Sequence, residues 1–355
     1  MSATAMIDLR SDTVTKPTKD MLRAMTSAEL GDDVLGDEPT VIRLQERCAE
    51  LMGKEAACFV PSGTMGNLTS IRALTEPGDE IIAHTDSHIF HYETGGYAAI
   101  AGCSMRHLSG ARGQFDADDV EAAVRPPNAH FPHSALVVIE NTQNRGGGSI
   151  WPIERIDRVV SMARAHGMKV HLDGARLWNA CAATGLEPSA YARHFDTVTS
   201  CFSKGLGTPA GSIVAGSDET IRRVHRFRKM LGGAMRQSGV LAAAALHALD
   251  HHRERLADDH ARARKLAAAI ANMPKLSIDP DAVETNIVYF DVDRSFGSAS
   301  EFTKRLATDG VRMLPTGPRR VRAVVSLAVT ADDIDRAIDL IGRIAGAPRS
   351  APIAN

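Results

Sequence analysis

Short hydrophobic runs alternate with longer amphipathic stretches through the middle of the chain. The runs predict strands at Ala56–Val60, Glu80–His84, Ala135–Glu140, Lys169–Asp173, Thr197–Phe202 and Ser212–Ala215. The stretches between them predict helices, among them Thr64–Leu74, Asp116–Val124, Ile153–Ala165 and Pro188–His194. Buried strands separated by helices are typical of a mainly parallel sheet that is covered on both faces. The pattern therefore predicts an α/β fold.

The alternation of short predicted strands with helices ends at about Ile221. A basic helix and a glycine-rich turn lead into a long alanine-rich helical region, Val240–Met273. The chain then predicts, in order, a strand, a helix, a strand and a helix at Asn286–Asp291, Ser300–Thr308, Val321–Val329 and Asp332–Ile344. We therefore expect a large α/β domain over residues 51–250, and a small α+β domain formed by residues 1–50 with residues 251–355.

Composition excludes several classes of protein. Hydrophobic residues make up 44% and charged residues 24%, which is ordinary for a globular chain and excludes a disordered one. The net charge of -2 gives no overall field towards nucleic acid or anionic lipid, so neither is expected as a partner. The five cysteines form no CxxC motif and fit a reducing compartment. No apolar stretch approaches the ~20 residues that cross a bilayer, and no secretory signal is apparent, so we expect a cytoplasmic protein.

The first motif that could carry chemistry follows the strand Ala56–Val60. A turn at Ser62 and Gly63 leads into a helix that starts at Thr64. An anion such as a phosphate can bind at such a helix start. Free backbone N–H groups, the hydroxyls of Ser62 and Thr64 and the space beside Gly63 are available to it there. The same residues also describe an ordinary capped turn. Neither a GxxxxGK[ST] nor a GxGxxG nucleotide motif is present.

The second motif places Asp173 at the end of a hydrophobic strand and Arg176 three residues later. In open α/β sheets, ligands bind at the carboxyl ends of the strands, where Asp173 would lie. A structural ion pair between these two residues is the alternative. Pairs such as His171 with Asp173, or His88 with His91, lack a third ligand at a recognisable spacing, so no metal is expected.

The third motif is Lys204, which follows the strand Thr197–Phe202 and precedes glycines. Partial burial lowers the pKa of an amine, and a neutral amine can attack an aldehyde to form a Schiff base. Alone, such a lysine usually faces solvent. An anion-binding turn, a strand-end aspartate and this lysine together fit one cofactor, pyridoxal 5'-phosphate. His88 could stack on the cofactor ring, or it could be an ordinary loop histidine.

Longer motifs extend over most of the chain. They include IDLRSDTVTKPT from Ile7, GDDVLGDEPT, KEAACFVPSGTMGN, DSHIFHYE, ENTQN, HLDGARLWNA, CFSKGLGTPAGS and RKMLGGAMRQSG. With these motifs the chain resembles the low-specificity L-threonine aldolases, which are fold-type-I pyridoxal-phosphate enzymes. The resemblance implies an aspartate-aminotransferase-like fold with a mainly parallel seven-stranded sheet and a smaller α+β domain. It also implies retro-aldol cleavage of L-threonine, L-allo-threonine and related β-hydroxy-α-amino acids to glycine and an aldehyde.

The resemblance implies a role for each matching residue of the cofactor site. Lys204 would form the Schiff base and Asp173 would face the pyridine nitrogen. Arg176 would lie near the phenolic oxygen and the substrate, and His88 would stack on the ring. The turn at Ser62, Gly63 and Thr64 would bind the phosphate.

The resemblance also implies residues that act on the substrate. Ser11 and Arg322 would hold the substrate carboxylate. His88, His130 or a water between them would take the proton of the β-hydroxyl group. Lys229 would reach the site from a neighbouring subunit, in a homodimer or in a homotetramer built as a dimer of dimers with shared active sites.

Three departures from the family pattern alter the surroundings of the substrate hydroxyl and side chain. The family usually has Tyr where this chain has Leu35, His where it has Gln143, and a Thr-His pair where it has Val325-Ser326. The cofactor contacts are unchanged. Two alternatives stay open: a sibling reaction with the same cofactor (β-elimination, racemisation or transamination), and a protein that has kept the fold without catalysis.

Overall fold

The computed structural model describes residues 6–346 and divides the chain into two compact units. The larger unit is Pro17–Arg253; the smaller combines the chain up to Lys16 with the chain from Glu254 onward. The second boundary lies close to the expected one, but residues 17–50 belong to the larger unit, not to the small domain. The reason is packing: helix α1 (Lys19–Thr26) lies against α11 (Gly239–His251), and α2 (Pro39–Met52) lies against α11 and strand β2 (Ala56–Val60).

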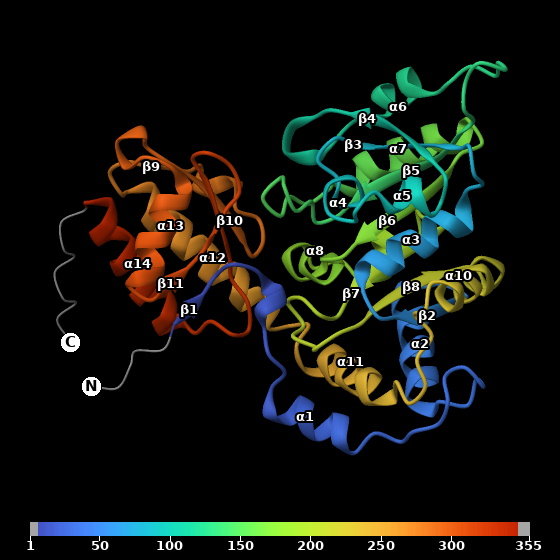
Figure 1. Cartoon of the computed structure of the whole chain (residues 1–355), viewed down its shortest axis with the longest axis horizontal. Coiled ribbons are helices and arrows are strands. Elements are labelled where there is room, and N and C mark those ends of the chain that lie inside the picture. Colours follow the sequence, from blue (N-terminus) through green and yellow to red (C-terminus); the bar gives the residue numbers. More distant parts are fainter. Residues whose placement is uncertain (1–5, 347–355) are drawn as a thin grey trace. The chain divides into compact units, whose positions relative to one another are not determined.

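The larger unit is built on a seven-stranded sheet with the order β2-β8-β7-β6-β5-β3-β4 (Figure 1). Its other strands are β3 (Glu80–His84), β4 (Ser104–Leu108), β5 (Ser134–Glu140), β6 (Lys169–Gly174), β7 (Thr197–Cys201) and β8 (Ser212–Gly216). Only β8 runs antiparallel to its neighbours, which confirms the mainly parallel sheet. Sequence patterning missed edge strand β4, because most of its side chains are only partly buried or exposed.

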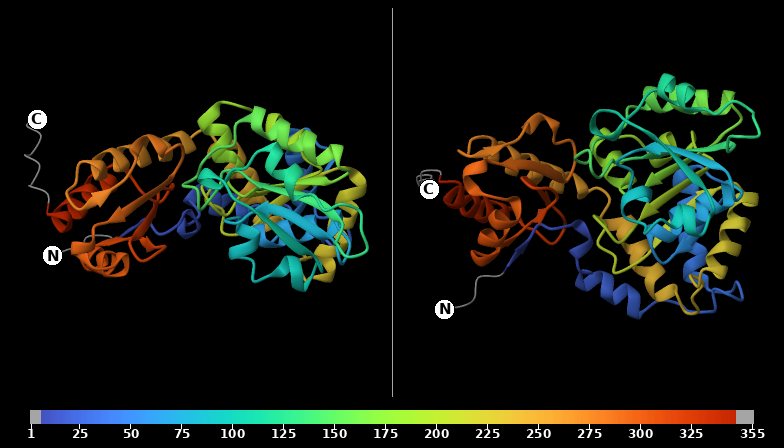
Figure 2. Two further views of the ribbon diagram at one scale, coloured as in Figure 1. Left: turned by 90° about the horizontal axis from the view of Figure 1, so that it is seen from above. Right: turned by 45° about the horizontal axis from the view of Figure 1, so that its top comes forward.

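Helices cover both faces of this sheet (Figure 2). Those not yet named are α3 (Gly63–Leu74), α4 (His88–His91), α5 (Gly96–Ala99), α6 (Ala117–Ala123), α7 (Ile153–Ala165), α8 (Leu177–Thr184), α9 (Pro188–Ala192) and α10 (Asp218–Met230). Helix α3 packs on β6, β7 and β8, and its first residue, Gly63, lies against Cys201 at the carboxyl end of β7. A Cβ on Gly66 would lie 2.6 Å from Cγ2 of Thr199 on β7, which shows how closely helix and sheet approach.

Substitution of Gly66 tests this close packing. Gly66→Ala is expected to lower the free energy of unfolding by about 1–3 kcal/mol, because overpacking outweighs the better helix propensity of alanine. Urea unfolding measures the change. The control is Gly96→Ala, whose Cβ would meet its nearest neighbour, Leu68 Cδ1, at an ordinary 3.5 Å. Equal stability of the two variants would contradict the expectation.

The smaller unit is an α+β layer, as the sequence predicts. An antiparallel sheet has the order β12-β13-β10-β9, and β1 pairs in parallel with β11. The strands are β1 (Ile7–Asp8), β9 (Leu276–Ser277), β10 (Ile287–Val292), β11 (Val311–Arg312), β12 (Leu314–Pro315) and β13 (Arg320–Val324). The helices are α12 (Leu256–Ala271), α13 (Ala299–Thr308) and α14 (Ala331–Ala345). Their apolar faces and those of β10 and β13 form one core.

Two expectations for the C-terminal part need correction. The alanine-rich region is two helices, α11 and α12, which belong to different units and are separated by a turn near His252. The strand expected at Val321–Val329 ends at Val324. Short 3₁₀ turns complete the structure at Asp12–Val14, Ala111–Gly113, Pro280–Ala282 and Arg294–Phe296. Within residues 6–346, no helix has the length and apolar character that crossing a membrane requires.

Candidate active site

The carboxyl ends of three neighbouring strands bring chemically active side chains to one edge of the sheet. Asp173 on β6 stands in register with Glu140 on β5, and both side chains are buried. The adjacent strand β7 ends at Cys201, and half-buried Lys204 follows in the loop. Parallel strands end at the same edge, where ligands bind in this class of fold. Asp173 and Lys204 therefore lie where the sequence predicts.

Asp173 is held by two donors and has a histidine nearby. One carboxylate oxygen accepts from the side-chain amide of Asn67 at 2.8 Å, and the other accepts from the backbone N–H of Ala175 at 3.2 Å. His88 Nδ1 lies 2.8 Å from Glu93 Oε1. One polar atom each from His88, Glu93 and Asp173 lie within 4.8 Å of one another. By distance these three could also coordinate a cation, although their hydrogen bonds already account for their positions.

Burial and charge shift the pKa values of this cluster. Burial alone would lower the pKa of His88, but the Glu93 hydrogen bond and the charges of Asp173 and Glu140 raise it above its ordinary value. Burial raises the pKa of Glu93, opposed in part by the His88 contact. Burial, together with the charge of Asp173, raises the pKa of Glu140 to about 7. Such shifts are typical of functional sites.

The start of α3 supplies the predicted anion-binding turn. Ser62 caps the helix, and its hydroxyl accepts from the backbone N–H of Met65 at 3.2 Å, so the ordinary capping role is also present. Ser62 and Thr64 are exposed. A Cβ on Gly63 would lie 2.6 Å from Cys201 Sγ and 3.7 Å from Ser212 Oγ. Among the described residues, that buried Ser212 hydroxyl has no hydrogen-bond partner.

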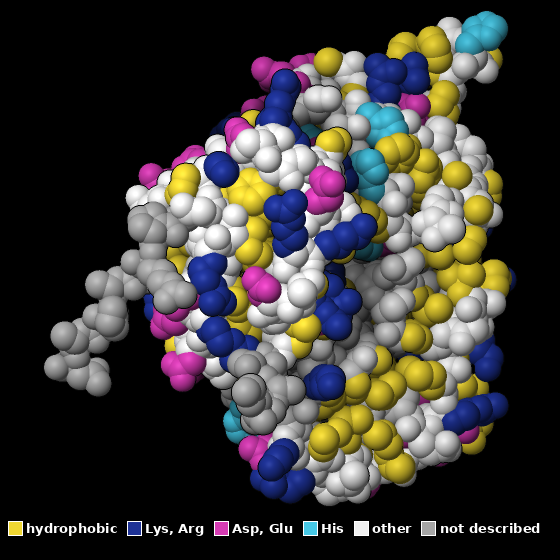
Figure 3. Space-filling view, turned by 60° about the vertical axis from the view of Figure 1, so that its left-hand side comes forward, with side chains coloured by type: hydrophobic (Ala, Val, Ile, Leu, Met, Phe, Trp, Pro, Cys, Tyr) yellow, Lys and Arg dark blue, Asp and Glu magenta, His cyan; other side chains and the backbone are white. Residues whose placement is uncertain are grey.

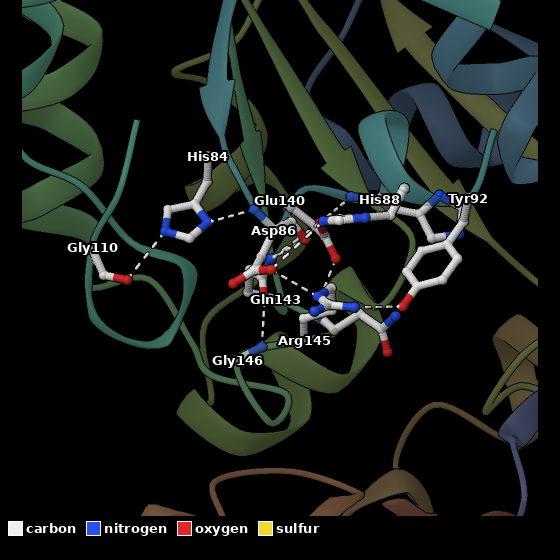
Figure 4. A network of polar contacts seen from close by, with 11 residues as sticks. His84, Asp86, His88, Tyr92, Gly110, Glu140, Gln143, Arg145 and Gly146 are labelled. Atoms are coloured by element: carbon white, nitrogen blue, oxygen red, sulfur yellow. Dashed lines mark hydrogen bonds and ion pairs between the residues drawn. The ribbon is translucent and has the colours of Figure 1, made fainter. Parts of the chain in front are cut away.

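Gln143, one of the departures from the family pattern, lies beside Glu140 (Figure 4). Its side chain is fully buried, and its amide donates to the Asp86 carbonyl at 3.0 Å and to Glu140 at 3.4 Å. Glu140 in turn accepts from the backbone N–H of His88 at 2.8 Å and of Asn144 at 2.9 Å. Gln143 therefore supports the carboxylate that holds the backbone of His88.

One predicted residue, His130, is not brought to this edge within its own chain. His130 is exposed in the loop before β5, at the amino end of the strand whose carboxyl end is Glu140. The length of the strand thus separates His130 from Asp173 and His88.

Lys229 is exposed in the last turn of α10. Arg176 is buried and directly precedes α8, three residues after Asp173.

The predicted carboxylate-binding residues belong to the smaller unit. Arg322 on β13 donates to the carbonyl of Arg10 at 3.3 Å, beside Ser11. The Ser11 hydroxyl accepts from the backbone N–H of Thr13 at 3.3 Å. Within this unit the structure thus brings Ser11 and Arg322 together. Ser326 belongs to the Val325-Ser326 departure from the family pattern. It is buried, and its hydroxyl lies 2.9 Å from that of Thr15.

Comparison with known proteins fits this geometry. A family model described as beta-eliminating lyase matches residues 8–293. The chain is 45% identical to probable low-specificity L-threonine aldolase 2 of Arabidopsis thaliana, over 95% of this chain and 97% of that protein. It is 40% identical to the low specificity L-threonine aldolase of Escherichia coli (strain K12), over 83% of this chain and 87% of that protein. The chain belongs to the low-specificity L-threonine aldolases.

Solved structures support the fold of this aldolase. The threonine aldolase of Leishmania major matches with a TM-score of 0.81 at 20% identity, over 96% of this chain and 99% of that one. The aspartate aminotransferase of Rhizobium meliloti matches with a TM-score of 0.70 at 14% identity, over 97% and 92%. The predicted aspartate-aminotransferase-like fold is confirmed.

Sequence reasoning missed three residues of the aldolase site: Asn67, Glu93 and Glu140. Asn67 and Glu93 meet Asp173 and His88 only through tertiary contacts, which no short motif reveals. Glu140 could have been predicted from sequence, since it is a charged residue at the end of an otherwise apolar strand and occupies the same position there as Asp173 on β6.

Glu140 makes stability depend on pH. From about pH 4.5 to 7 the unfolded chain releases the Glu140 proton while the folded chain keeps it, so raising the pH favours unfolding. Glu140→Gln removes this effect. Relative to wild type, its free energy of unfolding is expected to rise by on the order of 3 kcal/mol across that range. Urea unfolding of cofactor-free protein measures it, with exposed Glu121→Gln as the control. A pH-independent difference between Glu140→Gln and wild type would contradict the expectation.

Proposed function

We propose that this L-threonine aldolase, a carbon–carbon lyase, uses pyridoxal 5'-phosphate to cleave L-threonine, L-allo-threonine and related β-hydroxy-α-amino acids. The products are glycine and an aldehyde. One observation carries the proposal: buried Asp173 ends β6 beside His88, and Lys204 follows the end of the adjacent strand β7. The relatives named above carry the same activity in their names.

The residues of the larger unit fit this cofactor. The first turn of α3 offers backbone N–H groups, and the unpartnered Ser212 hydroxyl near Gly63 suits a phosphate oxygen. Asp173 is an acceptor suited to a protonated ring nitrogen, and Lys204 is an amine suited to an aldehyde. When bound, the cofactor supplies an aldehyde that joins amines and a ring that accepts an electron pair.

Each residue then has a distinct task. Lys204 would hold the cofactor by its aldehyde. Asp173 would hold the ring nitrogen in its protonated form, which suits the ring to accept the electron pair of the Cα–Cβ bond. Arg322 and Ser11 bind the substrate carboxylate. His88, held at Nδ1 by Glu93, has its other ring nitrogen available to receive the β-hydroxyl proton directly or through a water.

Product analysis tests the proposal. Purified protein loaded with pyridoxal 5'-phosphate is given L-threonine, L-allo-threonine, L-phenylserine and their D forms. We expect glycine and the matching aldehyde in equal amounts from L substrates. A 2-oxo acid with ammonia instead of glycine would indicate β-elimination, and conversion of L-threonine to D-allo-threonine without glycine would indicate racemisation at Cα; either would contradict the aldolase assignment.

Arg322→Ala tests the carboxylate site. It is expected to raise KM for L-threonine by about 10- to 100-fold and to slow the reaction, because a charge-assisted hydrogen-bond partner is lost. Steady-state kinetics measure the change. The matched control is Arg320→Ala on the same strand, whose side chain is exposed and pairs with Asp291. Unchanged kinetics in Arg322→Ala would place the carboxylate site elsewhere.

We also propose that the enzyme is a homotetramer, built as a dimer of dimers, whose subunits share active sites. Large hydrophobic side chains of the larger unit are exposed, among them Leu22, Leu35 and Met230. Figure 3 shows hydrophobic side chains gathered on one face of the molecule, and such surfaces favour self-association. Lys229, next to Met230, and His130 would then serve a neighbouring copy. Light scattering tests the assembly. Mixed Lys204→Ala and Lys229→Ala subunits should regain activity that neither variant has alone. A fully active monomer would contradict the proposal.

A further inference from the structure

Asn67 lies between the two carboxylates that serve the cofactor site. It belongs to α3, and its side chain is buried. Its amide nitrogen donates to Asp173 Oδ2 at 2.8 Å and to Glu93 Oε1 at 2.8 Å. Both hydrogens of one amide group are thus used on two different carboxylates.

The two carboxylates fix which way this amide points, and His171 is compatible with that orientation. Its Nε2 lies 3.1 Å from Asn67 Oδ1, and its Nδ1 lies 2.8 Å from the Thr197 hydroxyl. Burial lowers the pKa of His171 to about 4, so the ring is neutral and carries one N–H. That N–H lies on Nε2, because Asn67 Oδ1 only accepts, and the Thr197 hydroxyl donates to Nδ1. A flipped Asn67 would aim its carbonyl at two carboxylates, which only accept when ionised.

The two carboxylates have separate tasks. Asp173 would face the ring nitrogen of the bound cofactor, and Glu93 Oε1 lies 2.8 Å from Nδ1 of His88. Carboxylate oxygens this close repel each other. A donor group shared between them offsets that repulsion and holds both side chains in place.

We propose that Asn67 is a positioning residue that bridges Asp173 and Glu93 through its amide, so that the two carboxylates are placed to hold the ring nitrogen and His88 at the same time. His171, hydrogen-bonded to Thr197, is compatible with the orientation of this amide. The inference rests on the proposed function, since it assigns Asn67 a part in binding pyridoxal 5'-phosphate. Asn67 touches neither cofactor nor substrate in this role, and it acts through the two carboxylates.

Two variants of the full chain separate this role from simple packing. Asn67→Ala removes the amide, whereas Asn67→Asp keeps its size and shape and replaces the paired donors with a carboxyl group. We expect both to raise the Kd for pyridoxal 5'-phosphate by about 10-fold or more, and to shift the visible absorption maximum of the bound cofactor. A wild-type Kd in both variants would show that Asn67 only fills space.

Fluorescence titration with pyridoxal 5'-phosphate and absorption spectra provide the readouts, and circular dichroism checks the fold. The control is Ser70→Ala on the same helix, which removes a buried hydroxyl with no hydrogen-bond partner among the described residues and should leave Kd within about twofold. Should Asn67→Ala not fold, the isosteric Asn67→Asp alone decides. Wild-type Kd and spectrum in Asn67→Asp would overturn the inference. A wild-type enzyme that still binds the cofactor and releases glycine would leave the proposed function intact.

Discussion

Lys204→Ala is expected to lower kcat for cleavage of L-threonine by about 10³-fold or more, because the variant lacks the amine that would bind the cofactor covalently. Lys204 follows the strand next to Asp173, and its charge interacts with that of His88. The variant should also lose pyridoxal 5'-phosphate on dialysis, since only non-covalent contacts remain. Steady-state kinetics and the visible spectrum after dialysis measure the two effects.

The control for this prediction is Lys169→Ala. Lys169 lies at the opposite, amino end of β6, where its side chain is exposed and its amine is 3.8 Å from Asp196. Removing it changes the charge by the same amount and should leave kcat and cofactor retention unchanged. Normal cleavage of L-threonine by Lys204→Ala would contradict the role given to Lys204.

Asp173→Asn is expected to have the second-largest effect, a fall in kcat of about 10²- to 10³-fold. The substitution keeps the size of the buried side chain but removes its charge, so the ring nitrogen loses the partner that keeps it protonated. The negative charge that develops on cleavage is then poorly stabilised. Cofactor affinity should also fall, and the visible spectrum should report the altered ring.

Kinetics and spectra of Asp118→Asn provide the comparison, because this exposed carboxylate on α6 lies outside the site. Its kcat should match that of wild type. If Asp173→Asn retained kcat within about twofold, Asp173 would not be the residue that stabilises the negative charge developed on cleavage.

The edge of the sheet that carries the site was predictable from sequence. Asp173 and Lys204 each follow an apolar run, and parallel strands end at one edge, so the pattern alone places them near each other. The turn at Gly63 was predictable in the same way, because a small residue after a strand marks a helix start.

Other parts of the site depend on contacts between residues far apart along the chain. Asn67 meets Asp173 across 106 residues, and no local pattern encodes that pairing. Residues 17–50 join the larger unit because α1 and α2 pack on α11, which follows about two hundred positions later. The role expected of His130 stays a prediction: its loop enters β5 at the amino end, opposite to Glu140, so within one chain the strand separates it from the site.

The assigned activity requires covalent attachment of the cofactor to Lys204. Borohydride reduction of the protein loaded with pyridoxal 5'-phosphate, followed by proteolysis and mass spectrometry of the labelled peptide, tests this attachment directly. One reduced adduct per chain is expected, on Lys204. A label on any other lysine, or no label on protein that cleaves L-threonine, would contradict this attachment.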